Sequence, residues 1–325
     1  MLDDGRNKKT NAKPMMQPFS IAIHGGAGTL VKGMMTPDKE VAYKKALEHA
    51  LDLGYVILKN GESAVEAVEK AVVTLEDSPL FNAGKGSVFT ADGTHEMDAA
   101  IMDGRTLNAG AVSLISGIKN PVTLARDVME KSEHIFLAGK GALKFAKSLG
   151  YSLEHDDYFH DEFRYQQWQE IKDTDNFQLD HSVKKDSKFG TVGAVACDLH
   201  GNLAAATSTG GMTNKRFGRI GDSPMIGVGN YANNTTCAVS CTGSGEYFIK
   251  GVVAYDVSCL MEYKGLSLKD AASEVVYNRL LKIGGDGGLI AVDTHGNIAM
   301  PFNTEGMYRA SKTSLGEKLI QIYSD

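Results

Sequence analysis

One threonine lies at an abrupt change in the character of the chain. Gly190-Thr191 joins a polar segment, residues 151–189, which contains no glycine, to the apolar run of residues 191–198. A threonine hydroxyl is a weak nucleophile unless a base lies beside it, and the α-amine of an N-terminal threonine is such a base. Thr191 would gain that amine if the bond after Gly190 were cut, and glycine tolerates the strained backbone this requires. The alternative is a β-branched residue that starts a strand after a glycine hinge.

Charged and hydroxyl residues downstream could bind an amino acid. The forked guanidinium of Arg219 suits a carboxylate, and Asp222 could accept from an ammonium group. Thr242 and Gly243 precede an expected helix, where backbone N–H groups point outward and could hold an oxyanion. The alternatives are a surface pair of Arg219 with Asp222 and an ordinary helix cap by Thr242 or Ser244.

Several common catalytic motifs are absent from the sequence. It contains no G-x-S-x-G nucleophile elbow, no Walker A phosphate loop and no H-E-x-x-H pair. Four cysteines without C-x-x-C spacing indicate reduced thiols, as in a cytoplasmic protein; they are Cys197, Cys237, Cys241 and Cys259.

Composition limits the class of partner. The chain has 325 residues, with 34 Lys and Arg against 40 Asp and Glu and a net charge of −6. This acidic balance argues against nucleic acid, and no apolar run approaches the ~18–20 residues of a membrane span. Residues 1–20 lack the apolar core of a signal peptide. We therefore expect a cytoplasmic protein that binds a small molecule.

Hydrophobic periodicity predicts the elements that must position these residues. Residues 25–28 are expected to form a flexible turn, and residues 151–189 a polar, loosely structured linker. The sequences at 198–202 and 293–297, both D-x-H-G-N, predict two tight hairpins, and hairpin strands with long helices favour layered packing. Strands are expected at residues 19–24, 95–102, 109–116, 134–137, 191–198, 203–207, 289–293 and 298–302, and helices at residues 39–59, 62–76, 121–131, 140–149, 245–263 and 267–282.

A series of motifs follows in fixed order between about residues 19 and 309. They read IAIHGGAG at 21–28, PLFNAGKG at 79–86, MD at 97–98 with MDG at 102–104, GTVGAVA at 190–196, TSTGGMTNK at 207–215, GRIGDSP at 218–224 and FNTEGM at 302–307. With these motifs the chain resembles the plant-type asparaginase, or isoaspartyl peptidase, family of N-terminal-nucleophile hydrolases. The resemblance implies an α+β fold, a four-layer αββα sandwich formed by residues 1–325 as a single domain.

The resemblance also implies self-cleavage between Gly190 and Thr191. The products would be an α subunit, residues 1–190, whose residues 151–190 form a flexible linker, and a β subunit, residues 191–325. Two such pairs would assemble as an (αβ)₂ dimer. The implied activity is hydrolysis of β-aspartyl (isoaspartyl) dipeptides and of L-asparagine, with release of L-aspartate and without a catalytic cofactor.

Individual positions match the family's functional residues. Thr191 matches the nucleophile, Thr209 a hydroxyl that bonds to it, and Thr242 with Gly243 the oxyanion hole. The implied substrate-binding residues are Asn82, Arg219, Ile220, Gly221, Asp222, Thr242, Gly243, Ser244 and Gly245. A structural sodium ion would be bound by backbone carbonyls of Leu75, Glu76, Ser78, Phe81, Ala83 and Lys85.

Two other interpretations are less well supported by these residues. A glycosylasparaginase shares the nucleophile, but it usually has aspartate before it and asparagine after the Thr-Ser-Thr run, where this chain has Gly190 and Gly210. A catalytically silent family member that acts as a binding protein would not need the full set of matched site residues.

Overall fold

The computed structural model describes residues 18–174 and 190–324 as a mixed α/β structure. Its strands form two sheets, of eight strands in the order β12-β11-β1-β5-β6-β2-β3-β4 and of four in the order β10-β9-β8-β7. Neighbouring strands are antiparallel except for β3 and β4. The large sheet comprises β1 (Ser20–Gly28), β2 (Met97–Asp103), β3 (Ala109–Ile115), β4 (Phe136–Ala138), β5 (Val192–Cys197), β6 (Leu203–Thr209), β11 (Gly306–Thr313) and β12 (Lys318–Tyr323), and the small sheet β7 (Asn230–Ala232), β8 (Cys237–Gly243), β9 (Gly287–Asp293) and β10 (Ile298–Ala299).

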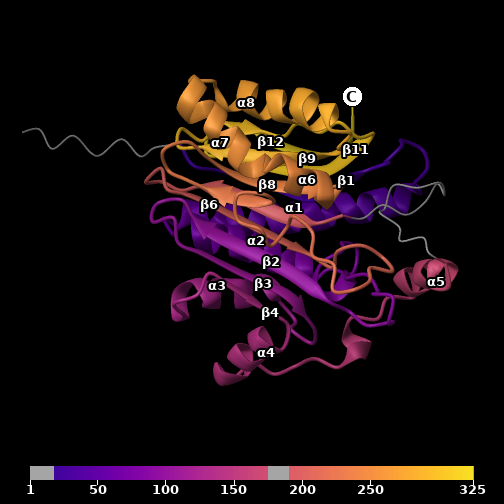
Figure 1. The fold of residues 1–325 in the computed structure, drawn as a ribbon. Helices are drawn as coiled ribbons and strands as arrows, with labels where there is room; N and C mark the ends of the chain where they lie inside the picture. Colours follow the sequence, from indigo (N-terminus) through magenta and orange to yellow (C-terminus); the bar gives the residue numbers. More distant parts are fainter. Residues whose placement is uncertain (1–17, 175–189, 325) are drawn as a thin grey trace, which may run out of the picture.

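Helices lie on the outer sides of the two sheets (Figure 1). Helices α1 to α4 accompany the large sheet, and α6 to α8 pack with the small one, whereas α5 lies near one margin of the molecule. Their bounds are α1 Pro37–Lys59, α2 Ala64–Glu76, α3 Pro121–Lys131, α4 Gly139–Ser148, α5 Glu162–Ile171, α6 Gly245–Gly251, α7 Val253–Lys264 and α8 Leu268–Glu274, the last continued by a π-helical turn, Val275–Leu280.

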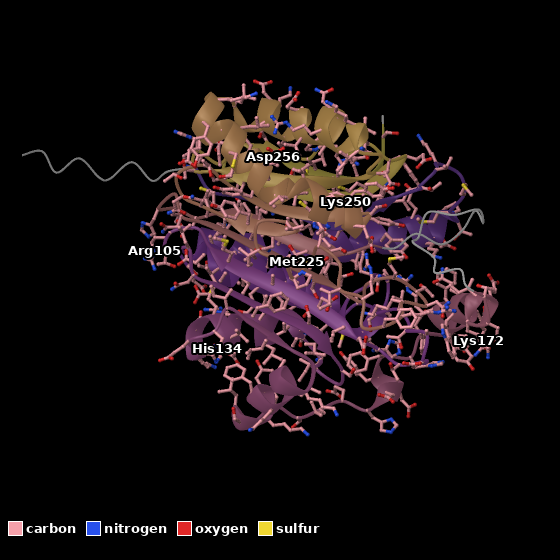
Figure 2. All side chains as sticks on the ribbon, in the orientation of Figure 1. Arg105, His134, Lys172, Met225, Lys250 and Asp256 are labelled. Atoms are coloured by element: carbon pink, nitrogen blue, oxygen red, sulfur yellow. The ribbon has the colours of Figure 1, made fainter. Side chains whose placement is uncertain are left out.

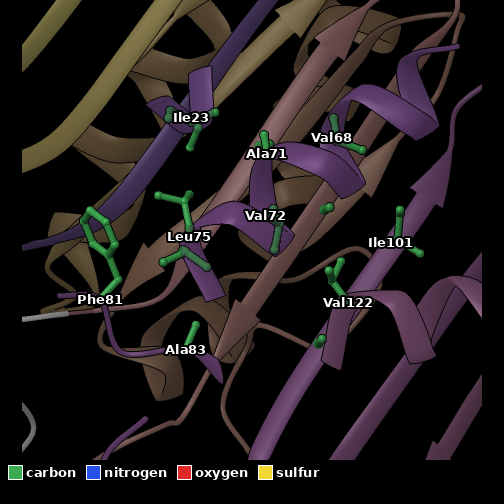
Figure 3. Packing of buried hydrophobic residues seen from close by; sticks show 14 of the residues in the cluster. Ile23, Val68, Ala71, Val72, Leu75, Phe81, Ala83, Ile101 and Val122 are labelled. Atoms are coloured by element: carbon green, nitrogen blue, oxygen red, sulfur yellow. The ribbon is translucent and has the colours of Figure 1, made fainter. Parts of the chain in front are cut away.

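Three clusters of buried apolar side chains hold these layers together. The first packs α1 to α3 against the large sheet, and Figure 3 shows Val68 and Val72 of α2 facing Ile101 of β2. The second lies between the two sheets and includes Val195 and Ile290. The third joins the small sheet to its helices. Because burial of apolar surface is the main stabilising term in folding, the packed sheets and helices form a rigid support for the strand ends.

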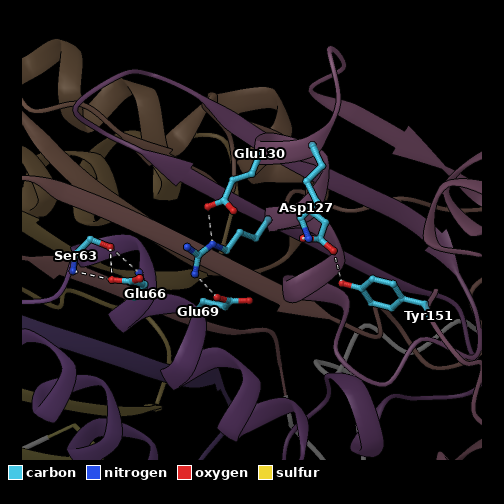
Figure 4. A network of polar contacts seen from close by, with 8 residues as sticks. Ser63, Glu66, Glu69, Asp127, Glu130 and Tyr151 are labelled. Carbon is cyan, nitrogen blue, oxygen red and sulfur yellow. Dashed lines mark hydrogen bonds and ion pairs between the residues drawn. The ribbon is translucent and has the colours of Figure 1, made fainter. Parts of the chain in front are cut away.

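Local sequence signals fix the ends of several helices. Thr36 caps α1 by accepting from Lys39 N at 3.3 Å, and Pro37 occupies the first turn, where its missing N–H costs nothing. Ser63 and Glu66 form a reciprocal capping box at the start of α2 (Figure 4). Arg126 of α3 then ties the two helices together through Glu69, at 2.6 Å.

Both predicted hairpins are confirmed. In β5–β6, Asp198 Oδ1 accepts from His200 N and Asn202 N, at 2.8 and 2.9 Å. In β9–β10, Asp293 Oδ1 accepts from the N–H groups two and four residues further on, at 2.9 and 3.0 Å. The same aspartate therefore organises the same turn in both sheets.

Two expected irregular segments carry regular structure. The turn predicted at residues 25–28 is wrong, because β1 continues to Gly28 and pairs with β11, with a bulge between His24 and Gly26. The loosely structured linker predicted at 151–189 is wrong for its first half, which contains α5; residues 175–189 lie outside the described part of the chain. Helix α5 docks through Trp168, whose ring stacks on Phe89 with centroids 5.6 Å apart.

The helix expected over residues 245–263 is divided in two. Val252, at φ 48°, separates α6 from α7, and the first N–H groups of α7 donate to a distant loop. Ala254 N bonds to Val228 O at 3.0 Å and Tyr255 N to Gly227 O at 2.8 Å. These contacts satisfy N–H groups that a continuous helix would use internally.

Charged side chains lie over the outside of the molecule (Figure 2). Arg105, in the turn between β2 and β3, and Lys250, on α6, are both exposed and are labelled in Figure 2. Among the described residues, none of the helices is both long and apolar enough to cross a lipid bilayer.

Leu47→Ala in α1 tests the packing against the large sheet. Leu47 is fully buried, so its truncation leaves a cavity and should lower the free energy of unfolding by about 2–5 kcal/mol. Val56→Ala is the matched control on the same helix, because Val56 is 49% exposed and its loss should change stability by less than about 0.5 kcal/mol. Urea denaturation of both variants measures the difference; equal effects would contradict the assigned inner face of α1.

Candidate functional site

Thr191 lies at the start of β5, in the centre of the large sheet, with 8% of its surface exposed. The pairing of Val192 with Ser208, continued by one residue, sets Thr191 opposite Thr209 on β6. The Thr191 hydroxyl lies 3.2 Å from Ser223 Oγ, whereas Thr209 Oγ1 accepts from Gly211 N at 3.0 Å. The sheet therefore brings both predicted threonines to one edge, and Ser223, which sequence reasoning missed, is the hydroxyl within bonding distance of Thr191.

The peptide bond before Thr191 is enclosed by β1 and by the end of β8. Gly26 adopts φ 117°, and a Cβ placed on it would lie 2.5 Å from Gly190 N. A Cβ placed on Gly190 would lie 3.0 Å from Thr242 Oγ1, which itself accepts from Ala27 N at 3.2 Å. Gly26 is thus required by the close approach of the Gly190 backbone, and the Thr242 hydroxyl lies against the residue before Thr191.

A histidine on β1 binds the backbone carbonyl of Thr191. His24 Nδ1 lies 2.9 Å from Thr191 O, and its Nε2 lies 2.8 Å from Ser240 Oγ in the small sheet. Burial lowers the pKa of His24 to about 3, against a smaller upward effect of the Thr191 carbonyl, so the imidazole is neutral. Sequence reasoning missed His24, although a single histidine at the end of an apolar strand was visible.

A second group of residues joins two loops near this edge. A Cβ placed on Gly245 would lie 2.8 Å from Asp222 Oδ1 and 3.0 Å from Arg219 Nη2, so the loops converge there. Arg219 binds both carboxylate oxygens of Glu246, at 2.9 and 3.0 Å. The predicted Arg219 and Asp222 are therefore brought together, and Glu246 is a further member that sequence reasoning missed. The predicted Ile220 and Gly221 lie between them in the same loop.

Asp222 is a buried carboxylate with spare bonding capacity. It is 4% exposed, and its Oδ2 has no hydrogen-bond partner among the described residues. Burial raises the pKa of Asp222 to about 7, although a hydrogen bond from its own backbone and the charge of Arg219 oppose the rise. A cationic ligand group beside Oδ2 would stabilise the ionised form. Ser223, which contacts Thr191, is the next residue and links this group to the threonine edge.

Asn82 has a supporting position. Its Nδ2 donates to Gly211 O at 2.7 Å, and its Oδ1 accepts from Val88 N at 3.1 Å. Gly210 N donates to its backbone carbonyl at 3.0 Å. Asn82 therefore holds the glycine turn that follows β6, and with it the end of the strand that carries Thr209. The predicted Ser244 donates to Asp286 Oδ1 and fixes the turn after Gly243.

In the loop after α2, two glycines pack against backbone carbonyls of residues earlier in the chain. A Cβ placed on Gly84 would lie 2.5 Å from Glu76 O, and one on Gly86 would lie 2.7 Å from Pro79 O. Phe81 O accepts from Ala83 N at 2.9 Å and keeps its second lone pair. Backbone carbonyl oxygens are the kind of donor that a hard cation such as sodium takes, so the donor type of this loop fits the expected ion. No cluster of three or more His, Cys, Asp or Glu able to hold a metal occurs in the described residues.

Comparison with known proteins identifies the family. A sequence model of the asparaginase family matches residues 16–322. The chain belongs to the asparaginase family. It is 54% identical over 298 residues to an isoaspartyl peptidase of Salmonella typhimurium, a match that covers 91% of this chain and 95% of that protein. It is 43% identical to an isoaspartyl peptidase/L-asparaginase of Xenopus laevis, over 90% of this chain and 91% of that protein, and 43% identical to a plant-type L-asparaginase of Pyrococcus abyssi, over 92% and 98%.

The resemblance drawn from the motifs is thus confirmed. In this member of the asparaginase family, the matched motifs meet near the edge where β1, β5, β6 and β8 end or begin. The motif at 21–28 supplies His24 and Gly26, and the motif at 190–196 supplies Thr191. The motif at 207–215 supplies Thr209, and the motif at 218–224 supplies Asp222 and Ser223.

Gly26→Ala tests whether the backbone of β1 must approach Gly190 this closely. The added Cβ would collide with Gly190 N while φ stays in the left-handed region, so we expect a loss of more than about 1 kcal/mol of stability. Gly33→Ala separates the steric collision from the strain of a left-handed φ, because Gly33 has φ 89° but no atom near its Cβ position. Thermal unfolding should rank Gly26→Ala as clearly more destabilised; the opposite order would contradict the close approach.

Proposed function

We propose that the protein is a threonine hydrolase that cuts itself between Gly190 and Thr191 and then hydrolyses β-aspartyl dipeptides and L-asparagine to L-aspartate. The observation that carries the proposal is the enclosed Gly190-Thr191 junction at the start of a central strand, with the Ser223 hydroxyl 3.2 Å from Thr191 Oγ1. The names of the relatives, isoaspartyl peptidase and plant-type L-asparaginase, support this choice of substrates.

The fold we propose is the four-layer αββα sandwich of N-terminal-nucleophile hydrolases, formed by residues 1–325. The cut would create an α subunit, residues 1–190, and a β subunit, residues 191–325. Strands of the two subunits would interleave in the large sheet, since β1 pairs with β5 and β11 and β2 pairs with β6. Ladder hydrogen bonds would therefore keep the subunits together after the cut. An (αβ)₂ assembly and a cytoplasmic location complete the proposal.

Self-cleavage would begin with an attack within the chain. Thr191 Oγ attacks the carbonyl carbon of Gly190, the C–N bond to Thr191 breaks, and the proton leaves Oγ and reaches the freed nitrogen. Ser223 Oγ, 3.2 Å away, would relay this proton, and Thr242, whose hydroxyl lies beside Gly190, would donate to the Gly190 oxyanion. Water then hydrolyses the ester and leaves Thr191 with a free α-amine.

Substrate hydrolysis would use the new amine as the base. It takes the proton from Thr191 Oγ, which attacks the side-chain carbonyl of the β-aspartyl group, while Thr242 and the Gly243 N–H hold the oxyanion. The amine product leaves with a proton, and water then releases aspartate from the acyl-enzyme. Arg219 would bind the substrate's α-carboxylate and Asp222 its α-ammonium group. Because that ammonium charge favours the carboxylate, binding would lower the pKa of Asp222 from about 7.

The carbonyl-lined loop after α2 is our proposed sodium site. The backbone carbonyls that would bind the ion belong to Leu75, Glu76, Ser78, Phe81, Ala83 and Lys85. The ion would stabilise the loop that leads to Asn82, and so the glycine turn that Asn82 holds. Sodium would have a structural role and would not take part in either hydrolytic step.

Thr191→Ala should leave one uncut chain without hydrolase activity, because both the nucleophile and the new amine are lost. Thr191→Ser keeps the hydroxyl and should still cut, more slowly. A denaturing gel after prolonged incubation measures this, with wild type giving two bands for residues 1–190 and 191–325. A cut in Thr191→Ala at the same bond, or an intact wild-type chain, would refute the nucleophile.

Processed wild-type protein should release aspartate from β-Asp-Leu and not from α-Asp-Leu. The two dipeptides have the same atoms, but only the first presents a side-chain carbonyl to Thr191 together with free α-carboxylate and α-ammonium groups. Amino-acid analysis of both reactions, beside L-asparagine, measures the preference. Equal turnover of the two dipeptides would contradict the isoaspartyl specificity, whereas turnover of asparagine alone would narrow the function to asparaginase.

A further inference from the structure

We propose that His24 is a positioning residue that fixes the backbone of Thr191 through a one-way chain of hydrogen bonds between the two sheets. This inference rests on the proposed function, and it assigns a role to four buried polar side chains that the mechanism above does not use. They are His24 on β1, Thr207 on β6, Asn230 on β7 and Ser240 on β8, all 0% exposed.

The chain runs back and forth across the layer between the sheets. Asn230 Nδ2 lies 3.0 Å from Thr207 Oγ1, and Thr207 Oγ1 lies 2.8 Å from Ser240 Oγ. Ser240 Oγ lies 2.8 Å from His24 Nε2, and His24 Nδ1 lies 2.9 Å from Thr191 O. Every link has good hydrogen-bond length, and the surrounding cluster is otherwise apolar.

The direction of each bond follows from its two ends. The Thr191 carbonyl can only accept, so His24 Nδ1 carries the hydrogen and donates it. Because the imidazole is neutral, Nε2 must accept, and the Ser240 hydroxyl therefore donates to it. Ser240 has then used its one hydrogen, so at 2.8 Å it accepts from Thr207, whose hydroxyl also lies 3.3 Å from the carbonyl of Gly229. Thr207 in turn accepts from the amide of Asn230, which closes the chain with one consistent direction.

The strand next to His24 leaves room for its imidazole ring. His24 pairs with Gly193 across β1 and β5, and a Cβ placed on Gly193 would overlap both His24 Nε2 and Ser240 Oγ. The imidazole therefore crosses a position that has no side chain, and only glycine leaves it room. Burial, which lowers the pKa of His24 to about 3, keeps the imidazole neutral, and the Thr191 carbonyl then requires the hydrogen on Nδ1.

The consequence for catalysis is geometric. A fixed Thr191 carbonyl limits rotation of the Thr191 backbone, so the amine and Oγ keep their direction toward the carbonyl they attack. His24 touches neither the proposed oxyanion hole nor the Arg219 and Asp222 clamp. Its loss should therefore reduce the rate of self-cleavage and kcat while KM stays nearly constant, as expected for misplacement of a reacting group.

Two substitutions at one position separate positioning from packing. Asparagine places an N–H near the location of Nδ1, whereas glutamine places its amide near Nε2. His24→Gln should slow self-cleavage and lower kcat about ten- to a hundredfold, with KM changed less than threefold. His24→Asn should recover most of that loss. His134→Gln, at an exposed histidine, is the control for substitution itself.

Ser240→Ala provides a test that leaves His24 in place. It removes the donor to Nε2, so the imidazole is held only through Nδ1 and its Nε2 is left without a partner, and kcat should fall while KM remains near the wild-type value. Circular dichroism and thermal unfolding of each purified variant identify any that do not fold. Equal kinetics of His24→Asn and His24→Gln, or a change confined to KM, would overturn the positioning role.

Different results would contradict the proposed function and the role of His24. Wild-type protein that neither cuts itself nor hydrolyses β-Asp-Leu would end the proposed function. Wild-type protein that does both, while folded His24→Gln and Ser240→Ala match it in self-cleavage and kcat, would leave the function standing and remove the role of His24.

Discussion

The structure depends on the hydrogen bonds that hold the Gly190-Thr191 junction where the two sheets meet. An unpaired polar atom in such a layer costs free energy comparable to a lost hydrogen bond, or more. The Thr191 carbonyl, the His24 ring and the Ser240 hydroxyl bond to one another, and the chain continues through Thr207 to the amide nitrogen of Asn230, whose Oδ1 has no hydrogen-bond partner among the described residues. Glycine is obligatory at Gly193, where a side chain would fill the path of these bonds.

The order of strands in the large sheet would hold both sides of the proposed cut in place. Strand β5 follows the proposed cut and lies between β1, from before the cut, and β6, from after it. A break at its first residue removes one covalent link but no ladder bond. The apolar layers on both sides of the large sheet do not depend on the bond before Thr191, so the proposed cut would leave them intact.

Sequence alone predicted the local part of this arrangement well. The Asp198 and Asp293 turns, helix α3 and the alignment of the motifs with the asparaginase family need only neighbouring residues or a fixed motif order. Helix α5 was missed because its apolar residues are aromatic and pack on Phe89, far away in the chain. Strand β8 was missed because small residues give it little periodic contrast. A single sequence does not state sheet register or contacts between distant loops. It therefore did not predict that His24 and Ser223 bond to Thr191.

The pair formed by Arg219 and Glu246 compensates one of the two charged groups that the proposed function assigns to substrate binding. The Arg219 side chain is 20% exposed, and its two hydrogen bonds to Glu246 offset the partial loss of water around the guanidinium. Asp222 has no such partner and instead lowers its own cost by taking up a proton, which is what a pKa of about 7 means. A zwitterionic amino-acid head supplies what each lacks: a carboxylate that shares Arg219 with Glu246, and an ammonium that displaces the proton of Asp222. If Asp222 binds the ammonium group as proposed, binding would tighten as the pH rises through about 7, because the proton would no longer compete. A ligand with only one of the two charges would leave either Arg219 or Asp222 uncompensated, so this arrangement would favour a free amino-acid head over a residue within a longer chain.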